Sequence, residues 1–560
     1  MPTMPTFQAA PTLRERFTLA VTVEQLLWVA GLYWAMAANR LFLGAALRGR
    51  AVADPGSWAL AAALALALVA LHVLLLAPLA HRRTVKPLLA LLIVATALAS
   101  YFMQSFHVYL DPSMVRNVLH TDPAEARELL SWTLVLHLVL YAGLPLALLA
   151  RVRIVRRPWP RALGRRLAHM LLAAALLVGA LLSVFQPLAS LMRNDKALRY
   201  LVTPGNMLWS LGAVLAQDAR GAAAPRQTVG ADATAGAVSA HRRRPLVVVL
   251  VVGETARAAN WGLDGYARPT TPELARLPLV NFTDVQSCGT NTEVSVPCMF
   301  SATGRHDYDE ALIRGSESML HVAARAGVGV WWRDNQSGCK GVCDGLPSED
   351  VISLNPPGLC AEGRCLDEGL LVGLDQRLAR AEGTQLWVLH MLGNHGPSYF
   401  RRYPPAFARF QPACESDDLQ QCSREQIVNA YDNALRYSDH VLASLVAKLQ
   451  AQAERVDTLL IYVSDHGESL GEHGLFLHGL PYAIAPDEQT RVPMFMWFSR
   501  GAPDAMGLDL GCLRQRAQAP ATHDHLFHTV LGLLDVRSQV IDERWDLSAD
   551  CRAATMAGGR

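Results

Sequence analysis

Carboxylate, imidazole and hydroxyl side chains stand directly after apolar runs in this 560-residue chain. Glu254 follows LVVVLVVG, Asp465 and His466 follow LLIYVS, and His395 follows LWVLHMLGN. Thr292 stands in a fourth element, SCGTNTEVSVPC. Oxygen and nitrogen donors of these types bind Zn²⁺ or Mn²⁺. A metal bound here would lower the pKa of a threonine hydroxyl and make it a nucleophile.

Each of these residues also has a simpler interpretation. An Asp-His pair after a strand often caps a helix or forms hydrogen bonds within its loop, and Thr292 alone is typical of a helix cap. The joint occurrence of acidic and histidine residues after several strands favours a metal site. A threonine at the start of a helix gains further from the free N–H groups and the helix dipole. Pro297 is compatible with a helix only near its beginning.

The runs that carry these residues are predicted to be strands of one sheet. They are rich in β-branched residues and occur at Leu246–Gly253, Val328–Trp332, Leu386–Met391, Leu459–Val463 and Val492–Phe498. Helical patterns separate them, including Glu425–Gln450. Such alternation predicts a layered α/β domain with buried, largely parallel strands. Residues at the carboxyl ends of parallel strands meet at one edge of the sheet, where ligands bind.

The first third of the chain is predicted to lie in a membrane. Only 18% of all residues are charged, which is low for a soluble protein. Five apolar stretches have spanning length: Phe17–Ala38, Trp58–Ala80, Pro87–Phe106, Leu130–Ala150 and Leu167–Leu188. The first contains Glu24, which either pairs near an interface or marks a functional position.

Charge distribution orients these spans. Residues 1–190 hold 17 Lys and Arg and 7 Asp and Glu, a difference of +10, whereas the rest of the chain carries −8. Positive charge collects before the first span, between the second and third, and between the fourth and fifth, so these segments should be cytoplasmic. Everything after residue 190 should then lie outside. We see no cleavable signal peptide, and the net charge of +2 gives no reason to expect nucleic-acid binding.

All ten cysteines lie at or after Cys288, which agrees with an oxidising compartment for the second half. Their clustering favours disulfides between neighbours, although spacing alone does not determine connectivity. The expected pairs are Cys288–Cys298, Cys339–Cys343, Cys360–Cys365, Cys414–Cys422 and Cys512–Cys551. A zinc ribbon is the alternative, but it needs repeated C-x₂-C pairs that are missing from the sequence.

These observations divide the chain into three parts. Residues 1–190 form a five-helix transmembrane domain, residues 191–245 a bridging helix and a flexible Ala/Gly-rich linker, and residues 246–560 the outer domain.

Several long motifs resemble the lipid phosphoethanolamine transferases of the sulfatase/alkaline-phosphatase-like superfamily. They are VGETARAANWGLDGYARPTTPEL, SCGTNTEVSVPCMFS, WWRDNQSGCKGVC, GNHGPSYFRRYPP and YVSDHGESLGEHGLFLHG. SMVRNVLHTDPAEA and LRYLVTPGN resemble the family's membrane part. The resemblance runs from the first span to about residue 500. Within the family, the sequence resembles the subgroup that modifies lipid A phosphates and confers polymyxin resistance. It implies an α/β/α sandwich of the alkaline-phosphatase/sulfatase type beside the α-helical transmembrane domain.

The resemblance also implies roles for individual residues. Thr292 would be the nucleophile, and Glu254, Thr292, Asp465 and His466 would bind one Zn²⁺ tightly, with Mn²⁺ less suited. His395 and His478 would line the site, where they bind a second, weaker metal or handle protons. Together with these two histidines, Thr290, Lys340 and Glu468 would hold the phosphoethanolamine group. Gln336 stands where the family often has Asn, so we leave it out of the expected site.

The activity implied is a metal-dependent transfer of phosphoethanolamine from phosphatidylethanolamine to a phosphate of lipid A, with release of diacylglycerol. The protein would be a monomer in a bacterial inner membrane, with its catalytic domain in the periplasm. Alternatives are transfer to a lipopolysaccharide core sugar, and a sulfatase, a phosphodiesterase or a lipoteichoic-acid-type glycerol-phosphate transferase. A non-catalytic membrane-anchored binding protein and a transporter belong to other classes. A complete set of ligand residues argues against the binding protein, and the scarcity of polar residues in the spans argues against the transporter.

Overall fold

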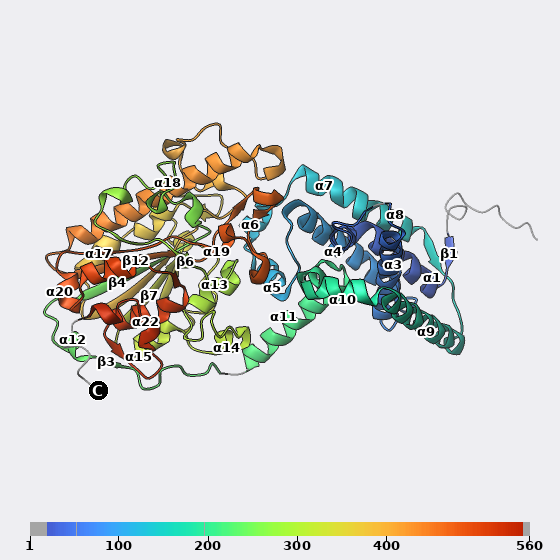
Figure 1. Ribbon diagram of the computed structural model, residues 1–560, viewed down its shortest axis with the longest axis horizontal. Helices are drawn as coiled ribbons and strands as arrows, with labels where there is room; N and C mark the ends of the chain where they lie inside the picture. Colours follow the sequence, from blue (N-terminus) through green and yellow to red (C-terminus); the bar gives the residue numbers. More distant parts are fainter. Residues whose placement is uncertain (1–18, 52, 195, 224, 553–560) are drawn as a thin grey trace, which may run out of the picture. The chain divides into compact units, whose positions relative to one another are not determined.

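The computed structural model describes residues 19–51, 53–194, 196–223 and 225–552. The chain divides into two compact units (Figure 1). Unit 1 comprises the described part of Met1–Asp111 together with Ser131–Gly212, and unit 2 comprises Pro112–Leu130 and Ala213–Arg560 as far as described. The boundary at Gly212 falls inside the stretch expected to be a bridge and linker. The segment Pro112–Leu130 belongs to unit 2, although helices of unit 1 precede and follow it in the chain.

Unit 1 is built mainly from apolar helices. Four helical stretches are long and apolar enough to cross a membrane within the described residues: Pro55–Leu76 (α3), Val85–Phe106 (α4), Trp132–Ala150 (α7 to α8) and Trp159–Ser183 (α9). The pair Val23–Ala38 and Arg40–Ala46 is bent by 62° and makes a fifth span if it is counted as one. Five spans were expected. Four are found as helical stretches, and the first expected span is present only if this bent pair is counted as one span.

The expected end of the fifth span differs from the observed one. Leu167–Leu188 was expected, whereas α9 ends at Ser183 and α10 (Phe185–Asn194) follows. Pro187 explains the break, because it has no N–H to donate to the carbonyl of Ser183. Residues 17 and 18 of the first expected span lie outside the described residues.

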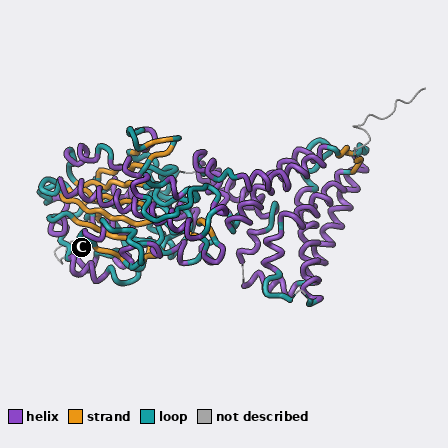
Figure 2. Tube along the Cα trace, turned by 90° about the horizontal axis from the view of Figure 1, so that it is seen from above, coloured by secondary structure: helices purple, strands orange, loops and turns teal. Residues whose placement is uncertain are grey.

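The core of unit 2 is a seven-stranded sheet with the order β5-β15-β12-β4-β11-β7-β8. Figure 2 shows its strands in orange among the helices of this unit. Strands β12 (Asp457–Ser464), β4 (Leu246–Gly253), β11 (Thr384–His390), β7 (Gly329–Asp334) and β8 (Ser348–Asp350) are parallel neighbours. β15 (Met494–Phe498) runs antiparallel to β12 and to β5 (Val280–Phe282). The carboxyl ends of the parallel strands therefore share one edge.

Helices cover both faces of this sheet. All eight residues of β4 are buried, and alternate side chains of the strand enter two separate apolar clusters. One cluster includes α13 (Thr292–Met299), α15 (Met319–Arg325) and α22 (Asp524–Leu533). The other includes α17 (Leu374–Ala379) and α18 (Arg424–Ala451). Unit 2 is thus an α/β/α sandwich, in which a continuous apolar run forms a strand buried on both faces.

All ten cysteines of unit 2 form disulfides, in the pairs expected from their spacing. They are Cys288–Cys298, Cys339–Cys343, Cys360–Cys365, Cys414–Cys422 and Cys512–Cys551. The first brackets the start of α13, and the second brackets Lys340. Two of the five cross-links therefore brace segments that carry candidate site residues.

Candidate metal centre

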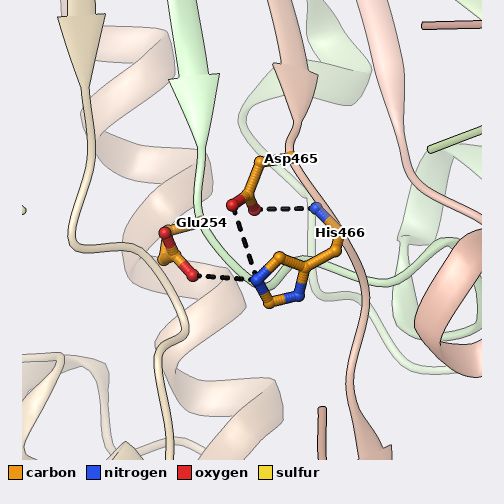
Figure 3. A group of neighbouring side chains, drawn as sticks. All are labelled: Glu254, Asp465 and His466. Carbon is orange, nitrogen blue, oxygen red and sulfur yellow. Dashed lines mark hydrogen bonds and ion pairs between the residues drawn. The ribbon is translucent and has the colours of Figure 1, made fainter. Parts of the chain in front are cut away.

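Three candidate ligands meet where two parallel strands end. Glu254 follows β4 directly, and Asp465 and His466 follow β12, its neighbour in the sheet. All three side chains are completely buried and point toward one another (Figure 3). The backbone N–H of Thr255 donates to Asp465 Oδ1 over 3.1 Å, which links the two strand ends. Adjacent parallel strands thus place residues more than 200 positions apart in one cluster.

Thr292, the first residue of α13, is the fourth candidate donor. Asn291 precedes it as N-cap, and the Asn291 side chain accepts the N–H of Val294 over 3.0 Å. The short helix also contains Pro297, which has no N–H for the carbonyl of Glu293. The guanidinium of Arg314 donates to that carbonyl instead. These contacts fix the turn from which the hydroxyl of Thr292 reaches the cluster.

The separations among the four donors fit one metal ion. Thr292 Oγ1 lies 3.1 and 3.2 Å from the carboxylate oxygens of Glu254 and 3.4 Å from His466 Nε2. His466 Nε2 lies 3.3 Å from Glu254 Oε1 and 3.4 Å from Asp465 Oδ2. Zinc bonds of about 2.0–2.1 Å in a tetrahedron place donor atoms about 3.3–3.4 Å apart. The residues present therefore fit a tetrahedral zinc site.

Electrostatics also favours a cation at this position. Burial alone would lower the pKa of His466, but the carboxylates of Asp465 and Glu254 raise it to about 10. Burial raises the pKa of Asp465 to about 6, and the charge of Glu254 adds to the shift. Two buried carboxylates thus hold a proton on the imidazole, and a bound metal ion would replace it. Asp465 Oδ2 accepts no hydrogen bond within the described part of the chain, which leaves it open to a metal.

Three further residues surround Glu254. Thr255 Oγ1 donates to Glu254 Oε1 over 2.6 Å, and Gln336 Nε2 donates to Glu254 Oε2 over 3.1 Å. His390 Nε2 lies 3.9 Å from the same oxygen, and its Nδ1 pairs with Asp334 Oδ1 over 2.7 Å. We left Gln336 out of the expected site and did not single out Thr255, His390 or Asp334. The feature of the sequence that could have indicated His390 and Asp334 is their position at the carboxyl ends of β11 and β7.

His395 and His478 lie beside the donor cluster. The His478 ring centroid lies 4.4 Å from that of His466 and 5.3 Å from that of His395. His478 Nδ1 pairs with Glu468 Oε2 over 2.8 Å, and Tyr399 donates to Glu468 Oε1 over 2.6 Å. Burial lowers the pKa of His478. Both oxygens of Glu468 are engaged in the structure, so this carboxylate orients His478.

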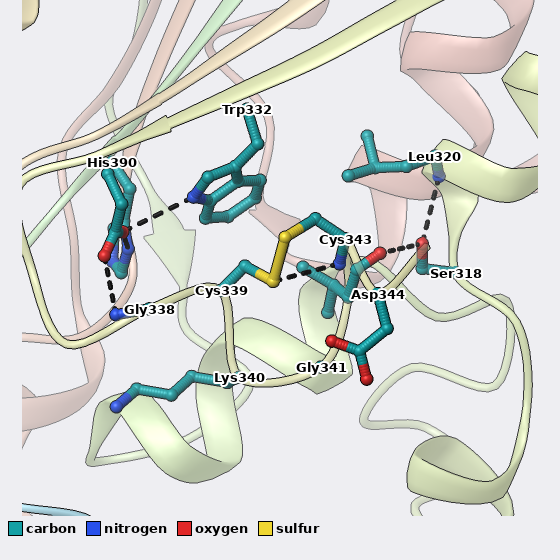
Figure 4. Close-up of a disulfide and its surroundings, with 12 residues drawn as sticks. Ser318, Leu320, Trp332, Gly338, Cys339, Lys340, Gly341, Cys343, Asp344 and His390 are labelled. Atoms are coloured by element: carbon teal, nitrogen blue, oxygen red, sulfur yellow. Dashed lines mark hydrogen bonds and ion pairs between the residues drawn. A yellow bond between two sulfur atoms is a disulfide. The ribbon is translucent and has the colours of Figure 1, made fainter. Parts of the chain in front are cut away.

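The remaining two residues of the expected site are also held by the protein. Thr290 Oγ1 donates to the carbonyl of Leu480 over 2.6 Å. Lys340 Nζ lies 2.6 Å from Ser337 Oγ and 3.0 Å from Glu293 Oε1. Glu293 is the residue that follows Thr292 in the sequence. Figure 4 shows the Lys340 side chain leading away from the disulfide that brackets it. Lys340 has a φ of 51°, a left-handed conformation held within this disulfide loop.

Comparisons with known proteins agree with both units. The sulfatase family matches residues 247–536, and the family described as phosphoethanolamine transferase EptA/EptB matches residues 68–219. Phosphoethanolamine transferase EptA of Escherichia coli (strain K12) is 39% identical over 470 residues, which cover 83% of this chain and 86% of the relative. Phosphatidylethanolamine transferase Mcr-1 of Escherichia coli is 38% identical over 473 residues, which also cover 83% and 86%.

A solved structure matches nearly the whole chain. It is the integral membrane protein lipooligosaccharide phosphoethanolamine transferase A (EptA) from Neisseria meningitidis, 37% identical, with a TM-score of 0.90. The match covers 95% of this chain and 99% of that structure. It therefore includes the membrane helices as well as the sulfatase-like unit. On this similarity in sequence and structure, the chain belongs to the phosphoethanolamine transferase family of EptA and Mcr-1.

Proposed function

We propose that this chain transfers phosphoethanolamine from phosphatidylethanolamine to a phosphate of lipid A, through a covalent intermediate on Thr292. The observation that carries the proposal is the position of the Thr292 hydroxyl, within 3.4 Å of both Glu254 and His466. A hydroxyl at a metal site and at a helix N-terminus has the surroundings of an activated nucleophile. The family supports phosphoethanolamine as the group transferred, and the lipooligosaccharide enzyme that matches the chain supports a lipid A-type acceptor.

The donor set suits one tightly bound Zn²⁺, held by Glu254, Thr292, Asp465 and His466, and is less suited to Mn²⁺. A bound ion supplies positive charge that lowers the pKa of the hydroxyl and offsets charge on the phosphoryl oxygens. We assign His395 and His478 to a second, weaker ion or to proton transfer. These assignments rest on residue types, burial and separations within the described residues.

In the first step, Thr292 Oγ1 attacks the phosphorus of phosphatidylethanolamine. The new Oγ1–P bond forms as the bond from phosphorus to the glycerol oxygen breaks. That oxygen takes up a proton, so diacylglycerol leaves. Thr292 loses its proton, and we assign the uptake and return of this proton to His395 and His478, of which His478 lies beside His466.

In the second step, a phosphate oxygen of lipid A attacks the same phosphorus. The Oγ1–P bond breaks, a new P–O–P linkage forms, and Thr292 recovers its proton. We assign to the Lys340 ammonium, which lies 3.0 Å from Glu293 Oε1, the role of attracting the anionic group that approaches Thr292. The two-step route lets both lipids use one site in turn.

The product places a cation beside a lipid phosphate. Cationic peptides bind a membrane surface through its negative charge, so this modification weakens the binding of polymyxin-like peptides. We place the protein in a bacterial inner membrane with unit 2 in the periplasm, as the loop charges and the five disulfides indicate.

The donor is tested with purified full-length protein and phosphatidylethanolamine labelled on an acyl chain. We expect labelled diacylglycerol from the wild type and none from Thr292→Ala. Labelled phosphatidylglycerol serves as the comparison, because a glycerol-phosphate transferase releases diacylglycerol from that lipid instead. Release from phosphatidylglycerol alone would overturn the proposed donor. Release from neither lipid, by protein that is folded and zinc-loaded, would reject the transferase proposal.

A further inference from the structure

The segment Pro112–Leu130 is part of unit 2 although it lies between two apolar helices of unit 1 in sequence. It contains α5 (Pro112–His120) and α6 (Pro123–Glu128). Ionic contacts hold both of its ends. At one end, Arg116 pairs with Asp218 and Glu310. At the other end, Glu128 pairs with two arginines of the sulfatase-like fold.

Glu128 forms a carboxylate clamp whose two oxygens bind different arginines. Its Oε1 lies 2.5 Å from Arg364 Nη1, and its Oε2 accepts from Arg402 Nη2 over 2.8 Å. The side chains of Glu128 and Arg402 are 5% and 1% exposed. Because both side chains are buried, loss of either partner would leave the other charge desolvated and uncompensated. Glu128 and Arg402 are separated by 274 positions, so the clamp joins distant parts of the chain.

The same guanidinium reaches a residue of the candidate site. Arg402 Nε donates to the carbonyl of His395 over 2.7 Å, while its Nη2 is held by Glu128. The loop that carries His395 is tied down on its other side by Asp367, which accepts the N–H groups of Leu392 and Gly393, each over 2.8 Å. The planar guanidinium thus connects Glu128 to the backbone of His395 in one fixed geometry.

One residue of the segment also lines a cavity together with that histidine. Asp122, Gln336, Arg364 and His395 share the wall of a small cavity of about 40 Å³. Arg364 also lines an adjacent cavity of about 840 Å³ that includes Arg127 and Glu128. The two cavities share Gly363, Arg364, Cys365 and Leu392. Glu128 therefore lines a cavity that shares part of its wall with the cavity that His395 lines.

We propose that Glu128 is a positioning residue of the transfer reaction, which acts through Arg402 to fix His395 beside His478. The proposal rests on the proposed function and adds a residue from between the membrane helices to the catalytic site. Its charge holds the Arg402 guanidinium in line with the His395 carbonyl. Without that charge, Arg402 turns away or recruits another partner, and the loop of His395 loses one of its two restraints.

The test compares Glu128→Gln with Asp218→Asn in full-length, zinc-loaded protein and follows labelled diacylglycerol release from phosphatidylethanolamine. Asp218→Asn weakens the other anchor of the same segment and leaves the pair of Arg116 with Glu310 in place. We expect Glu128→Gln to lower kcat by about 10- to 100-fold with KM for the donor unchanged, as small displacements of a reacting group do. Asp218→Asn should leave kcat near the wild-type value.

A double-variant comparison separates positioning from a general loss of stability. If Glu128 acts through Arg402, then Glu128→Gln combined with Arg402→Gln should be no slower than Arg402→Gln alone. Arg402→Lys keeps a cation for Glu128 but loses the planar fork that also reaches His395, so kcat should fall while the fold is retained. If Glu128→Gln does not fold, Arg402→Lys tests the proposal in its place.

Each outcome has a distinct meaning. A wild-type kcat in Glu128→Gln, an equal loss of kcat in Asp218→Asn, or fully additive losses in the double variant would overturn the positioning role. A wild type that releases no diacylglycerol would reject the proposed function instead, because the assay then has no activity for Glu128 to influence.

Discussion

The hydroxyl of Thr292 and the nearer carboxylate oxygen of Glu254 lie 3.1 Å apart across 38 positions of sequence. One residue begins a helix and the other ends a strand, so the sandwich fold itself brings them together. Asp465 and His466 complete the group from the neighbouring strand. We propose that these four donors hold one metal ion and that Thr292 is the nucleophile, and the predictions below follow from this proposal.

Removal of the metal should lower both activity and stability. A ligand that binds only the folded state stabilises it by about 2.7 kcal/mol when its free concentration is a hundred times Kd. Chelation should therefore lower the melting temperature of the wild type and abolish diacylglycerol release, and added Zn²⁺ should restore both. Asp465→Asn should lack this metal-dependent rise in melting temperature. An equal rise in the variant would contradict the assignment of Asp465 as a ligand.

His390 should tune the metal site without binding the metal. Its Nδ1 pairs with Asp334, and its Nε2 faces Glu254. Loss of such an outer partner typically costs about 10- to 100-fold in metal affinity or activity. We expect a loss of this size in Zn²⁺ affinity for His390→Gln, measured by competition with a chelating dye. His440→Gln is the matched control, because His440 pairs with Glu273 away from the site, and it should leave the affinity unchanged.

Two disulfides should differ in what their removal changes. Cys512–Cys551 spans 39 positions and Cys339–Cys343 spans 4, so loop entropy predicts losses of about 4 and about 2 kcal/mol. Only the smaller loop holds Lys340 in its left-handed conformation beside the site. Replacement of Cys512 and Cys551 by Ser should thus lower stability more, whereas replacement of Cys339 and Cys343 by Ser should lower activity more. Denaturant unfolding and diacylglycerol release measure the two effects, and the reverse ranking of activities would contradict the role of this loop.

Asp439 should make the stability of unit 2 depend on pH. Burial raises the pKa of Asp439 to about 7, against an ordinary value of 3.8, and its carboxylate accepts the N–H groups of Glu273 and Leu274. The folded state therefore holds a proton that the unfolded state releases between these values. The stabilisation that this proton gives the folded state is complete below pH 3.8 and is lost as the pH rises through 7. Relative to Asp439→Asn, the free energy of unfolding of the wild type should fall from about pH 4 to 7. A constant difference over that range would contradict the raised pKa.

The sheet and the donors at its edge could be predicted because their signals are local. β4 and β12 are apolar runs followed at once by Glu254 and by Asp465, and parallel strands place such ends together. The long helix α18 was also predicted within one residue at each end. The end of α9 was missed because hydropathy continues through Pro187, whereas the backbone hydrogen bonds do not.

The outer partners of the site could not be predicted because they depend on long-range packing. Gln336 reaches Glu254 from the neighbourhood of a third strand, and His390 faces the same carboxylate from a fourth. The contact between Glu128 and Arg402 is still less accessible to sequence reasoning. The segment of Glu128 has the pattern of a short loop between membrane spans, and nothing local indicates which surface it packs against.

Lipid A mass spectrometry tests the central claim most directly. Lipid A would be extracted from a Gram-negative host that expresses the wild type, Thr292→Ala or Thr292→Ser, with membrane insertion checked for each protein. We predict a gain of one phosphoethanolamine with the wild type, a residual gain with Thr292→Ser, and no gain with Thr292→Ala. Unmodified lipid A beside folded, inserted wild type would contradict the acceptor, and a gain that persists in Thr292→Ala would contradict the covalent route.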